Sequence, residues 1–191
     1  LNIDKAVQFS NLAGGIVVGK IGSATTTLNE MIQYEASLSK SSSNKHIKSI
    51  IEITRLVEDL KSDGKKIVFT NGCFDILHVG HISYLETAKS FGDILILGLN
   101  SDRSVKALKG KDRPVNNQLD RAYILTALES VDYVVIFDED TPHELIKTIK
   151  PNVLVKGGDY KGEEVIGQDI ADELKLVEFI EGKSSTQTIT K

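Results

Sequence analysis

The feature of this sequence that most constrains its fold is an alternation between short β-rich runs and segments with helical periodicity. Residues with high strand propensity gather in five runs, Ile67–Phe69, Ile94–Leu99, Tyr133–Phe137, Val153–Val155 and Leu176–Ile180. Alternation of this kind is typical of parallel strands joined by crossover helices. The sequence therefore predicts an α/β fold with a doubly wound, five-stranded parallel sheet and helices on both faces.

Three of the intervening segments have readable helix boundaries. Apolar residues recur at helical spacing over residues 47–60, which predicts a lead-in helix before the first strand. Asn116 or Asn117 can cap a second helix. The stretch Thr141-Pro-His-Glu144 combines an N-cap residue, a first-turn proline and a glutamate at the capping-box position, which predicts the start of a third helix.

The composition changes at the serine-rich stretch Leu38-Ser-Lys-Ser-Ser-Ser-Asn-Lys45, which is typical of a linker. We therefore expect three parts, namely a first unit at 1–38, a linker at 39–44 and the α/β domain at 45–191. A chain of 191 residues with 40% hydrophobic content is long enough for one such domain and a smaller unit.

Charge and composition exclude several classes of function. The 23 basic and 27 acidic residues leave a formal charge of −4, which argues against nucleic acid as a partner. The single Cys73 excludes an internal disulfide, and no apolar run approaches the roughly 20 residues of a membrane span. Residues 1–24 lack the basic and apolar regions of a secretory signal. We expect a soluble, cytoplasmic protein that does not bind membranes.

Polar, glycine-rich clusters follow the end of each predicted strand. In chain order they are residues 70–81, Asn100-Ser-Asp102, Asp138-Glu-Asp-Thr141, Lys156-Gly-Gly-Asp159 and Glu181-Gly-Lys-Ser-Ser-Thr186. The carboxyl ends of all strands in a doubly wound sheet lie on one edge, where ligands bind at the topological switch point. The five clusters therefore predict one composite site.

The first cluster contains His78 and His81 three residues apart across Gly80. A metal site would need a third and usually a fourth protein ligand, and the nearest cysteine, Cys73, lies five residues before His78. The plainer alternative is two histidines that lie at the surface or form hydrogen bonds in the core. The strand-to-helix position favours a third interpretation, because a helix N-terminus attracts anions and two imidazoles there would bind phosphates.

The quoted residues also resemble a known family. Thr70-Asn-Gly-Cys-Phe-Asp75 followed by His78-Val-Gly-His81 resembles the HxGH signature of the nucleotidyltransferase superfamily, whose fold is Rossmann-like. The resemblance continues through Gly98–Asp102, Leu108–Pro114, Asp120-Arg121, Val131–Val134, Asp138–Pro142 and Val155–Tyr160. Together these motifs resemble the heptose-1-phosphate adenylyltransferase branch. Ser184-Ser-Thr-Gln187 corresponds to the second superfamily signature and departs from its commoner forms at Lys183 and Gln187.

The resemblance implies adenylyl transfer from ATP to D-glycero-β-D-manno-heptose 1-phosphate, giving ADP-heptose and pyrophosphate for the lipopolysaccharide inner core. It implies Mg²⁺ held mainly by the ATP phosphates, with no metal site built from the protein. The implied partners are ATP and a sugar 1-phosphate, and a homo-oligomer stays open.

The resemblance also implies roles for individual residues. Catalytic roles fall to His78, His81 and Lys109. Nucleotide binding falls to Gly72, Cys73, Phe74, Gly80, Arg121, Lys156, Gly157, Ser184, Ser185 and Thr186. Binding of the sugar phosphate falls to Asp75, Asn100 and Arg113.

Several of these residues have a second interpretation. Lys109 and Arg113 belong either to a solvated loop or to a lid over phosphates. Arg121 either contacts phosphate or pairs with a neighbouring acid, and Asp75 is either a turn residue or a ligand of the acceptor. The acids at 138–140 are helix-start residues first and sugar ligands second.

The first unit, residues 1–38, resembles the closing segment of a ribokinase-like sugar kinase, which implies a fused kinase domain in the full-length protein but no kinase activity in this piece. Gly14 and Gly19-Lys20 approximate a phosphate-binding loop, yet Ile21 stands where that motif needs Ser or Thr. Two rival functions stay open for the α/β domain: a cytidylyltransferase acting on glycerol 3-phosphate or a related alcohol phosphate, and a non-catalytic nucleotide-binding module.

Overall fold

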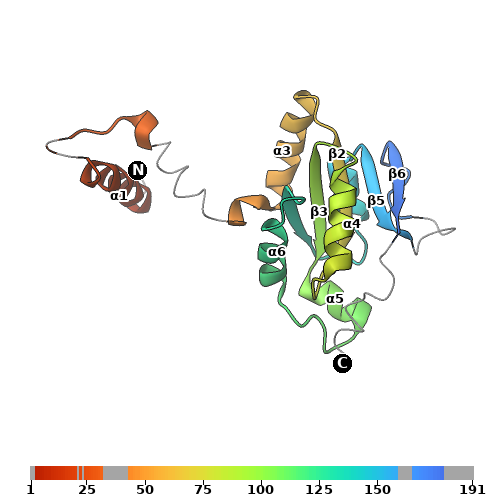
Figure 1. Ribbon diagram of the computed structural model, residues 1–191. Helices are drawn as coiled ribbons and strands as arrows, with labels where there is room; N and C mark the ends of the chain where they lie inside the picture. The colour runs from red at the N-terminus through yellow and green to blue at the C-terminus, as the bar shows by residue number, and fades with distance from the viewer. Residues whose placement is uncertain (1–2, 21, 23, 32–42, 159–164, 179–191) are drawn as a thin grey trace. The chain divides into compact units, whose positions relative to one another are not determined.

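The computed structural model describes residues 3–20, 22, 24–31, 43–158 and 165–178 (Figure 1). The chain divides into two compact units, 1–45 and 46–191. The elements are α1 (Ile3–Val18), a 3₁₀ turn η1 (Ser43–His46), β1 (Ile47–Lys48), α3 (Ile50–Ser62), β2 (Ile67–Gly72), α4 (Val79–Lys89), β3 (Ile94–Asn100), α5 (Asp102–Lys109), α6 (Gln118–Thr126), β4 (Tyr133–Phe137), α7 (His143–Ile149), β5 (Val153–Gly157) and β6 (Glu173–Val177).

The first unit contains α1, and this helix passes through Gly14 without interruption. A phosphate-binding loop at Gly14 is therefore ruled out, because that motif needs an open loop between strand and helix. Lys20 forms an ion pair with Glu30 at 2.6 Å. No helix in the described segments of either unit is long and apolar enough to cross a bilayer.

The second unit is built on a six-stranded parallel sheet with the order β1-β4-β3-β2-β5-β6. The doubly wound α/β prediction is confirmed, and all five predicted strands are present. The sixth strand, β1, is a two-residue edge strand that pairs with Val134 and Val135 of β4. The apolar pattern of the sequence predicts these two residues as part of the lead-in helix, so this part of the prediction is wrong.

The lead-in helix starts later than predicted because Ser49 caps it. The Ser49 hydroxyl accepts a hydrogen bond from the backbone N–H of Glu52 at 3.3 Å, and the Glu52 carboxylate accepts one from the Ser49 N–H at 2.8 Å. This capping box fixes the first helical residue as Ile50. The preceding Ile47 and Lys48 are thus left extended and pair with the sheet.

Two other boundaries differ from the sequence prediction, and one agrees. The last strand, β6, begins at Glu173, three residues earlier than predicted, because an edge strand tolerates polar residues that a search for apolar runs passes over. The capping box predicted at Thr141 is wrong, since Pro142 is the N-cap of α7 and no side chain caps it. Asn117 caps α6 as predicted, accepting from the N–H groups of Leu119 and Asp120.

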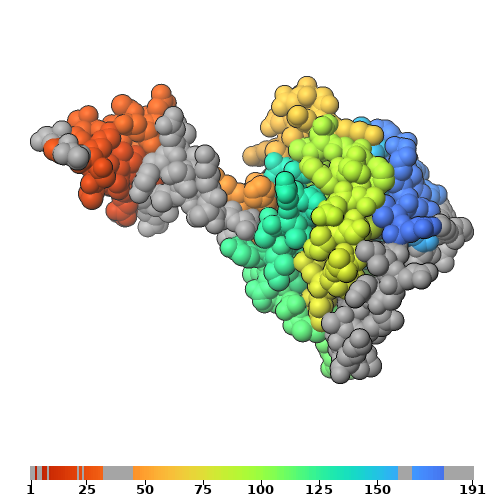
Figure 2. Space-filling model, in the orientation of Figure 1, coloured from red at the N-terminus to blue at the C-terminus, as the bar shows by residue number. Residues whose placement is uncertain are grey.

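Two separate apolar cores cover the two faces of the sheet. On one face, Leu85 and Ala88 of α4 and Leu125 of α6 pack on Leu97 and its strand neighbours. On the other face, α3 and α7 pack on alternate residues of the same strands; the members include Ile53, Val57, Phe69, Ile96, Ile146, Ile149 and Leu154. Figure 1 shows α4 and α6 on the near face, and their side chains cover the sheet in Figure 2.

The strand order reverses at β2, which is the first long strand and lies in the middle of the sheet. The chain proceeds from β2 to β3 and β4 on one side, and then returns to place β5 and β6 on the other side. β2 pairs with β3 over six positions, from Ile67 to Gly72, but with β5 only through Val68 and Phe69. The carboxyl ends of β2 and β5 therefore separate, which opens the sheet at its switch point.

Replacing Ser49 by alanine tests the capping box. The variant loses the hydroxyl that accepts from the Glu52 N–H, so we expect the free energy of unfolding to fall by roughly 1 kcal/mol. Urea denaturation followed by circular dichroism measures the change. Ser90→Ala is a matched control. Ser90 is the C-cap residue of α4, and its hydroxyl donates to the Thr87 carbonyl, so it does not cap a helix N-terminus. An equal loss in both variants would contradict the capping role.

Candidate functional site

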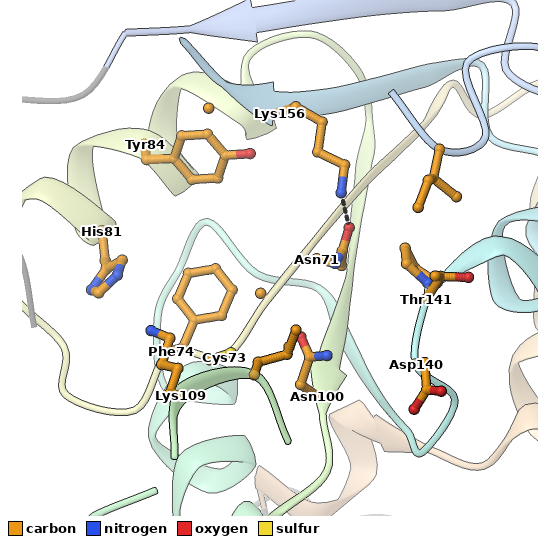
Figure 3. A pocket seen from close by; sticks show the side chains of 15 residues that line it. Asn71, Cys73, Phe74, His81, Tyr84, Asn100, Lys109, Asp140, Thr141 and Lys156 are labelled. Carbon is orange, nitrogen blue, oxygen red and sulfur yellow. Dashed lines mark hydrogen bonds between the residues drawn. The ribbon is translucent and has the colours of Figure 1, made fainter. Parts of the chain in front are cut away.

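A cavity of about 400 Å³ opens at the carboxyl edge of the sheet, where β2 and β5 separate (Figure 3). Polar clusters that follow β2, β3, β4 and β5 meet there. Its lining consists of Asn71, Gly72, Cys73, Phe74, His81, Tyr84, Asn100, Leu108, Lys109, Asp140, Thr141, Pro142, Lys156, Gly157 and Ile166. The fifth predicted cluster, with Ser184, Ser185 and Thr186, lies outside the described residues.

The turn between β2 and α4 is held in a tight conformation. Phe74 has a φ of +44°, a backbone conformation that residues other than glycine rarely adopt. Its ring lies over Gly72, where an added Cβ would stand 2.8 Å from the ring. Gly72 is therefore required for the close approach of Phe74. Burial raises the pKa of the neighbouring Cys73 thiol, and this keeps the sulfur protonated and unsuited to nucleophilic attack.

The two histidines lie at the start of α4. His78 is the N-cap residue, with an extended backbone, and its carbonyl accepts from the His81 N–H at 2.9 Å. The two imidazole rings stack with their centroids 3.8 Å apart, and the Phe74 ring lies 5.2 Å from that of His81. Gly80 is buried between them in the first helical turn. This stacking brings both rings to one end of α4, beside the cavity that His81 lines.

The electrostatics of the site keep His81 neutral. Burial, together with the nearby His78 and Lys109, lowers the pKa of His81 to about 4. Its Nδ1 atom is buried and has no hydrogen-bond partner among the described residues. No group of three or more histidine, cysteine or acidic residues in the described segments could hold a metal ion. A neutral imidazole beside a lysine and a helix N-terminus is suited to donating hydrogen bonds to anions.

Arg121 is a buried connector rather than an open ligand. Its side chain, 1% exposed, donates to the Cys73 carbonyl at 2.6 Å, to the Asn116 carbonyl at 3.0 Å and to the Asp102 carboxylate at 2.8 Å. These three partners belong to the turn after β2, the loop before α6 and the start of α5. Of the two interpretations from sequence, pairing with a neighbouring acid is the one that this geometry supports.

Asp75 is fully buried and holds the loop that carries Arg113. Its carboxylate accepts from Arg113 Nε at 2.5 Å, from the Val115 N–H at 2.7 Å and from the Asn116 N–H at 3.2 Å. Burial alone would raise the pKa of Asp75, but these donors outweigh it and lower the pKa. The Arg113 Nη2 atom is buried without a hydrogen-bond partner in the described part of the chain. Asp75 thus organises a loop, whereas Arg113 keeps a donor for a ligand.

A second group of polar lining residues comes from the end of β3 and from the loop before α7. Asn100, at the end of β3, is nearly buried and donates to the Ser104 hydroxyl at 2.9 Å. Thr141 and Asp140 reach the cavity from the loop before α7 (Figure 3). Asp140 also lies 3.6 Å from the Arg103 guanidinium. The cavity therefore has His81 and Lys109 on one side and Asn100, Asp140 and Thr141 on the other.

Of the predicted site residues that the structure describes, ten line or adjoin the cavity and three do not. Gly72, Cys73, Phe74, His81, Asn100, Lys109, Lys156 and Gly157 line the cavity, and His78 and Gly80 adjoin it. Asp75, Arg113 and Arg121 are absent from its lining and form ion pairs beside it.

Sequence reasoning missed several lining residues. Asn71 and Tyr84 could have been found, because Asn71 follows the buried Phe69 at two-residue spacing and Tyr84 follows His81 at helical spacing. Ile166 lies in a turn with no periodic signal, so nothing in the sequence indicates its place.

A doubly wound parallel sheet with a histidine pair on the first helical turn at its switch point defines a Rossmann-like domain of the nucleotidyltransferase class. The model of the cytidylyltransferase-like family matches residues 69–190, and the chain belongs to this family.

Curated relatives match the chain at high identity. It is 70% identical over 191 residues to the bifunctional protein HldE of Aliarcobacter butzleri and 63% identical over 190 residues to that of Sulfurimonas denitrificans. Each alignment covers 100% of this chain and 40% of the relative. The chain thus spans about two fifths of the length of these relatives.

Two solved structures are similar to this one. A lipopolysaccharide core biosynthesis protein from Thermoplasma volcanium matches with a TM-score of 0.52 and 29% identity, covering 63% of this chain and 100% of that protein. The pantoate-beta-alanine ligase of Francisella tularensis matches with a TM-score of 0.54 and 17% identity, covering 76% of this chain and 72% of that one. The second likeness supports the fold alone.

An Arg121→Lys variant tests the connector role. Lysine keeps the charge but lacks the planar set of donors that reaches three partners, so we expect the free energy of unfolding to fall by roughly 1–3 kcal/mol. Arg55→Lys, on the exposed side of α3, is the matched control. Chemical denaturation measures both. Unchanged stability of Arg121→Lys with weakened nucleotide binding would support a ligand role instead.

The lowered pKa of His81 predicts a pH-dependent stability. Its pKa is about 4 in the folded chain against an ordinary value of 6.5, so the unfolded chain binds the proton more tightly. The free energy of unfolding should therefore fall as the pH is lowered from about 6.5 to about 4. Urea denaturation across this range should show a shallower slope for His81→Asn than for the wild type. His143→Asn is the control, and an equal change of slope in both variants would contradict the assignment.

Proposed function

We propose that the second unit transfers an adenylyl group from ATP to D-glycero-β-D-manno-heptose 1-phosphate, releasing ADP-heptose and pyrophosphate. The observation that carries the proposal is the stacked pair of His78 and His81 at the start of α4, beside a cavity at the switch point of the sheet. The motifs that resemble the heptose-1-phosphate branch support the choice of acceptor. The name of the Thermoplasma volcanium structure, a lipopolysaccharide core biosynthesis protein, agrees with it.

The reaction needs no nucleophile from the protein. An oxygen of the acceptor phosphate forms a new bond to the α-phosphorus of ATP, and the bond between the α-phosphorus and the bridging oxygen to the β-phosphate breaks. Pyrophosphate leaves with that electron pair. A phosphate monoester is already ionised near neutral pH, so catalysis consists mainly of positioning and charge stabilisation. The raised pKa of the Cys73 thiol is consistent with this scheme.

The residues on the α4 side of the cavity are suited to the triphosphate. His78, His81 and Lys109 would donate hydrogen bonds to its oxygens, and the first turn of α4 adds backbone N–H groups. Gly72, Gly157 and the backbone of Cys73 and Phe74 allow the nucleotide to approach the sheet edge closely. Ser184, Ser185 and Thr186 are proposed as further nucleotide contacts on the family resemblance alone.

Magnesium fits the site as an ion carried by the nucleotide. Asp140 is the one carboxylate among the described lining residues of the cavity. One carboxylate suits Mg²⁺ that keeps most of its ligands from phosphate oxygens and water. The ion would neutralise charge on the departing pyrophosphate.

We infer that residues 1–38 are the end of a kinase domain. The relatives are named bifunctional and are longer than this chain, which covers 40% of each. This piece is not expected to phosphorylate a sugar. A reaction that consumes ATP, in a chain whose single cysteine excludes an internal disulfide, supports a cytoplasmic location.

The cytidylyltransferase-like family match keeps a second function in view, namely cytidylyl transfer to glycerol 3-phosphate or a related alcohol phosphate. The test is to incubate the chain with ATP or CTP and with heptose 1-phosphate or glycerol 3-phosphate, and to measure pyrophosphate. We expect release only with ATP and heptose 1-phosphate. Release with CTP and glycerol 3-phosphate would favour the second function, and nucleotide binding without release in any mixture would favour a non-catalytic module.

Replacing either histidine by alanine should slow turnover. Each imidazole is assigned to charge that develops on the leaving pyrophosphate, so we expect kcat to fall by roughly 10²-fold or more. His46→Ala, a histidine outside the cavity that contacts the Asp132 carbonyl, should leave kcat unchanged. Circular dichroism checks that each variant is folded. Turnover near the wild-type value in folded His78→Ala and His81→Ala proteins would overturn the assigned roles.

A further inference from the structure

The cavity has two halves that lie on opposite faces of the sheet. His81 and Tyr84 line it from α4, and the Tyr84 hydroxyl shares a hydrogen bond of 2.7 Å with Thr70 of β2. The next residue of β2, Asn71, faces the other side. A Cβ added to Gly98 would stand 3.2 Å both from Asn71 Cβ and from Leu145 of α7, so Asn71 belongs to the α7 face.

Lys156 lies at the boundary between the two halves. It follows Leu154, which packs in the core beside α3 and α7, by two residues along β5, so its side chain starts on that same face. The pairing of β2 with β5 ends at Phe69 and Leu154. Two residues further on, Lys156 Nζ donates to the Asn71 side-chain oxygen across the opening (Figure 3). Only 7% of Lys156 is exposed, and it lines the cavity.

We propose that Lys156 binds the attacking phosphate of the acceptor, rather than the nucleotide as the sequence resemblance implied. The inference rests on the proposed function. The donor triphosphate is assigned to the α4 half, with His81 and Lys109, whereas hydroxyl-binding groups such as Asn100 and Thr141 lie in the α7 half. The phosphate that joins acceptor to donor must then lie between the halves, where Lys156 is placed.

The chemistry of Lys156 makes it a determinant of acceptor specificity. An ammonium has three N–H donors, so it can hold the Asn71 oxygen and a phosphate oxygen together. A phosphate monoester offers the ammonium a charged hydrogen-bond acceptor, whereas a neutral alcohol offers only a weaker, uncharged one. Asn71 acts as a positioning residue, because its oxygen directs the ammonium toward the centre of the cavity. The site should therefore select acceptors that carry a phosphate.

The test is a Lys156→Met variant, which keeps the length of the side chain and removes the charge. We expect kcat/KM for heptose 1-phosphate to fall by roughly 10- to 100-fold, the loss of one charge-assisted hydrogen bond. The dissociation constant of ATP, measured by calorimetry without acceptor, should stay within about threefold, because the contact is made to the acceptor. Lys147→Met, which removes a lysine from the exposed side of α7, is the matched control.

A second variant keeps the proposal falsifiable if Lys156→Met does not fold. Asn71→Asp preserves the shape of the side chain and places a carboxylate against the ammonium, so it should raise the KM of the acceptor while Lys156 is still present. A loss of ATP affinity with an unchanged acceptor KM in either folded variant would overturn the proposal and restore Lys156 to the nucleotide. Acceptor kinetics equal to those of Lys147→Met would overturn it as well.

The outcome can be separated from failure of the proposed function. If the wild-type chain releases no pyrophosphate with ATP and heptose 1-phosphate, the proposed function fails before any variant is compared. If the wild type is active and Lys156→Met keeps the same kcat/KM for the acceptor, only the role of Lys156 fails.

Discussion

The interaction on which the site most depends is the set of three hydrogen bonds made by the buried guanidinium of Arg121. It joins the turn after β2, the start of α5 and the loop before α6, none of which is held to the others by strand pairing. Each segment carries a group assigned to the ligand: the turn carries Phe74, α5 ends at Lys109, and the loop carries Arg113. A charge buried to this extent is stable only because all its partners are in place. The geometry of the site therefore depends on a buried side chain that is not part of the cavity lining.

Parallel topology explains why the cavity has two chemically different halves. Successive side chains of a strand point to opposite faces, so Thr70 contacts α4 whereas Asn71 faces α7. At the switch point, β2 and β5 no longer pair beyond Phe69, so side chains from both faces of the sheet reach one opening. Such an arrangement suits the proposed reaction, because the acceptor oxygen attacks the α-phosphorus on the side opposite the departing pyrophosphate. The sheet supplies this separation without an additional domain.

The parts of the fold that could be predicted from sequence are those governed by local patterns. Five strands were found because buried parallel strands are continuous apolar runs, and the Asn117 cap was found because a short polar side chain preceded a helical pattern. β1 was missed because the apolar Ile47 extends the helical pattern, and only the Ser49 cap and the pairing with β4 decide between helix and strand. The predicted cap at Thr141 is wrong because Pro142 is the N-cap residue of α7.

The site could be predicted as a set of strand-end clusters, but not as a set of contacts. Arg121 and Asp75 were recognised as polar residues near the ligand edge. Yet two of the three partners of Arg121 lie 19 and 48 positions away along the chain, and the partners of Asp75 lie 38 to 41 positions away. Contacts over such separations follow from tertiary structure, which no local pattern records. Whether an arginine binds a ligand or a backbone carbonyl depends on burial, and burial of a charged side chain is the property that sequence indicates least well.

The low pKa of His81 follows from the burial of its ring and from two basic neighbours. Burial, His78 and Lys109 all disfavour the imidazolium form, so the ring adds no positive charge beside Lys109 near neutral pH. A triphosphate beside the ring would act in the opposite direction and favour protonation. The imidazole carries an N–H donor in either state, because the neutral ring has one and the protonated ring has two. In its proposed role, His81 can therefore donate a hydrogen bond to phosphate in either protonation state.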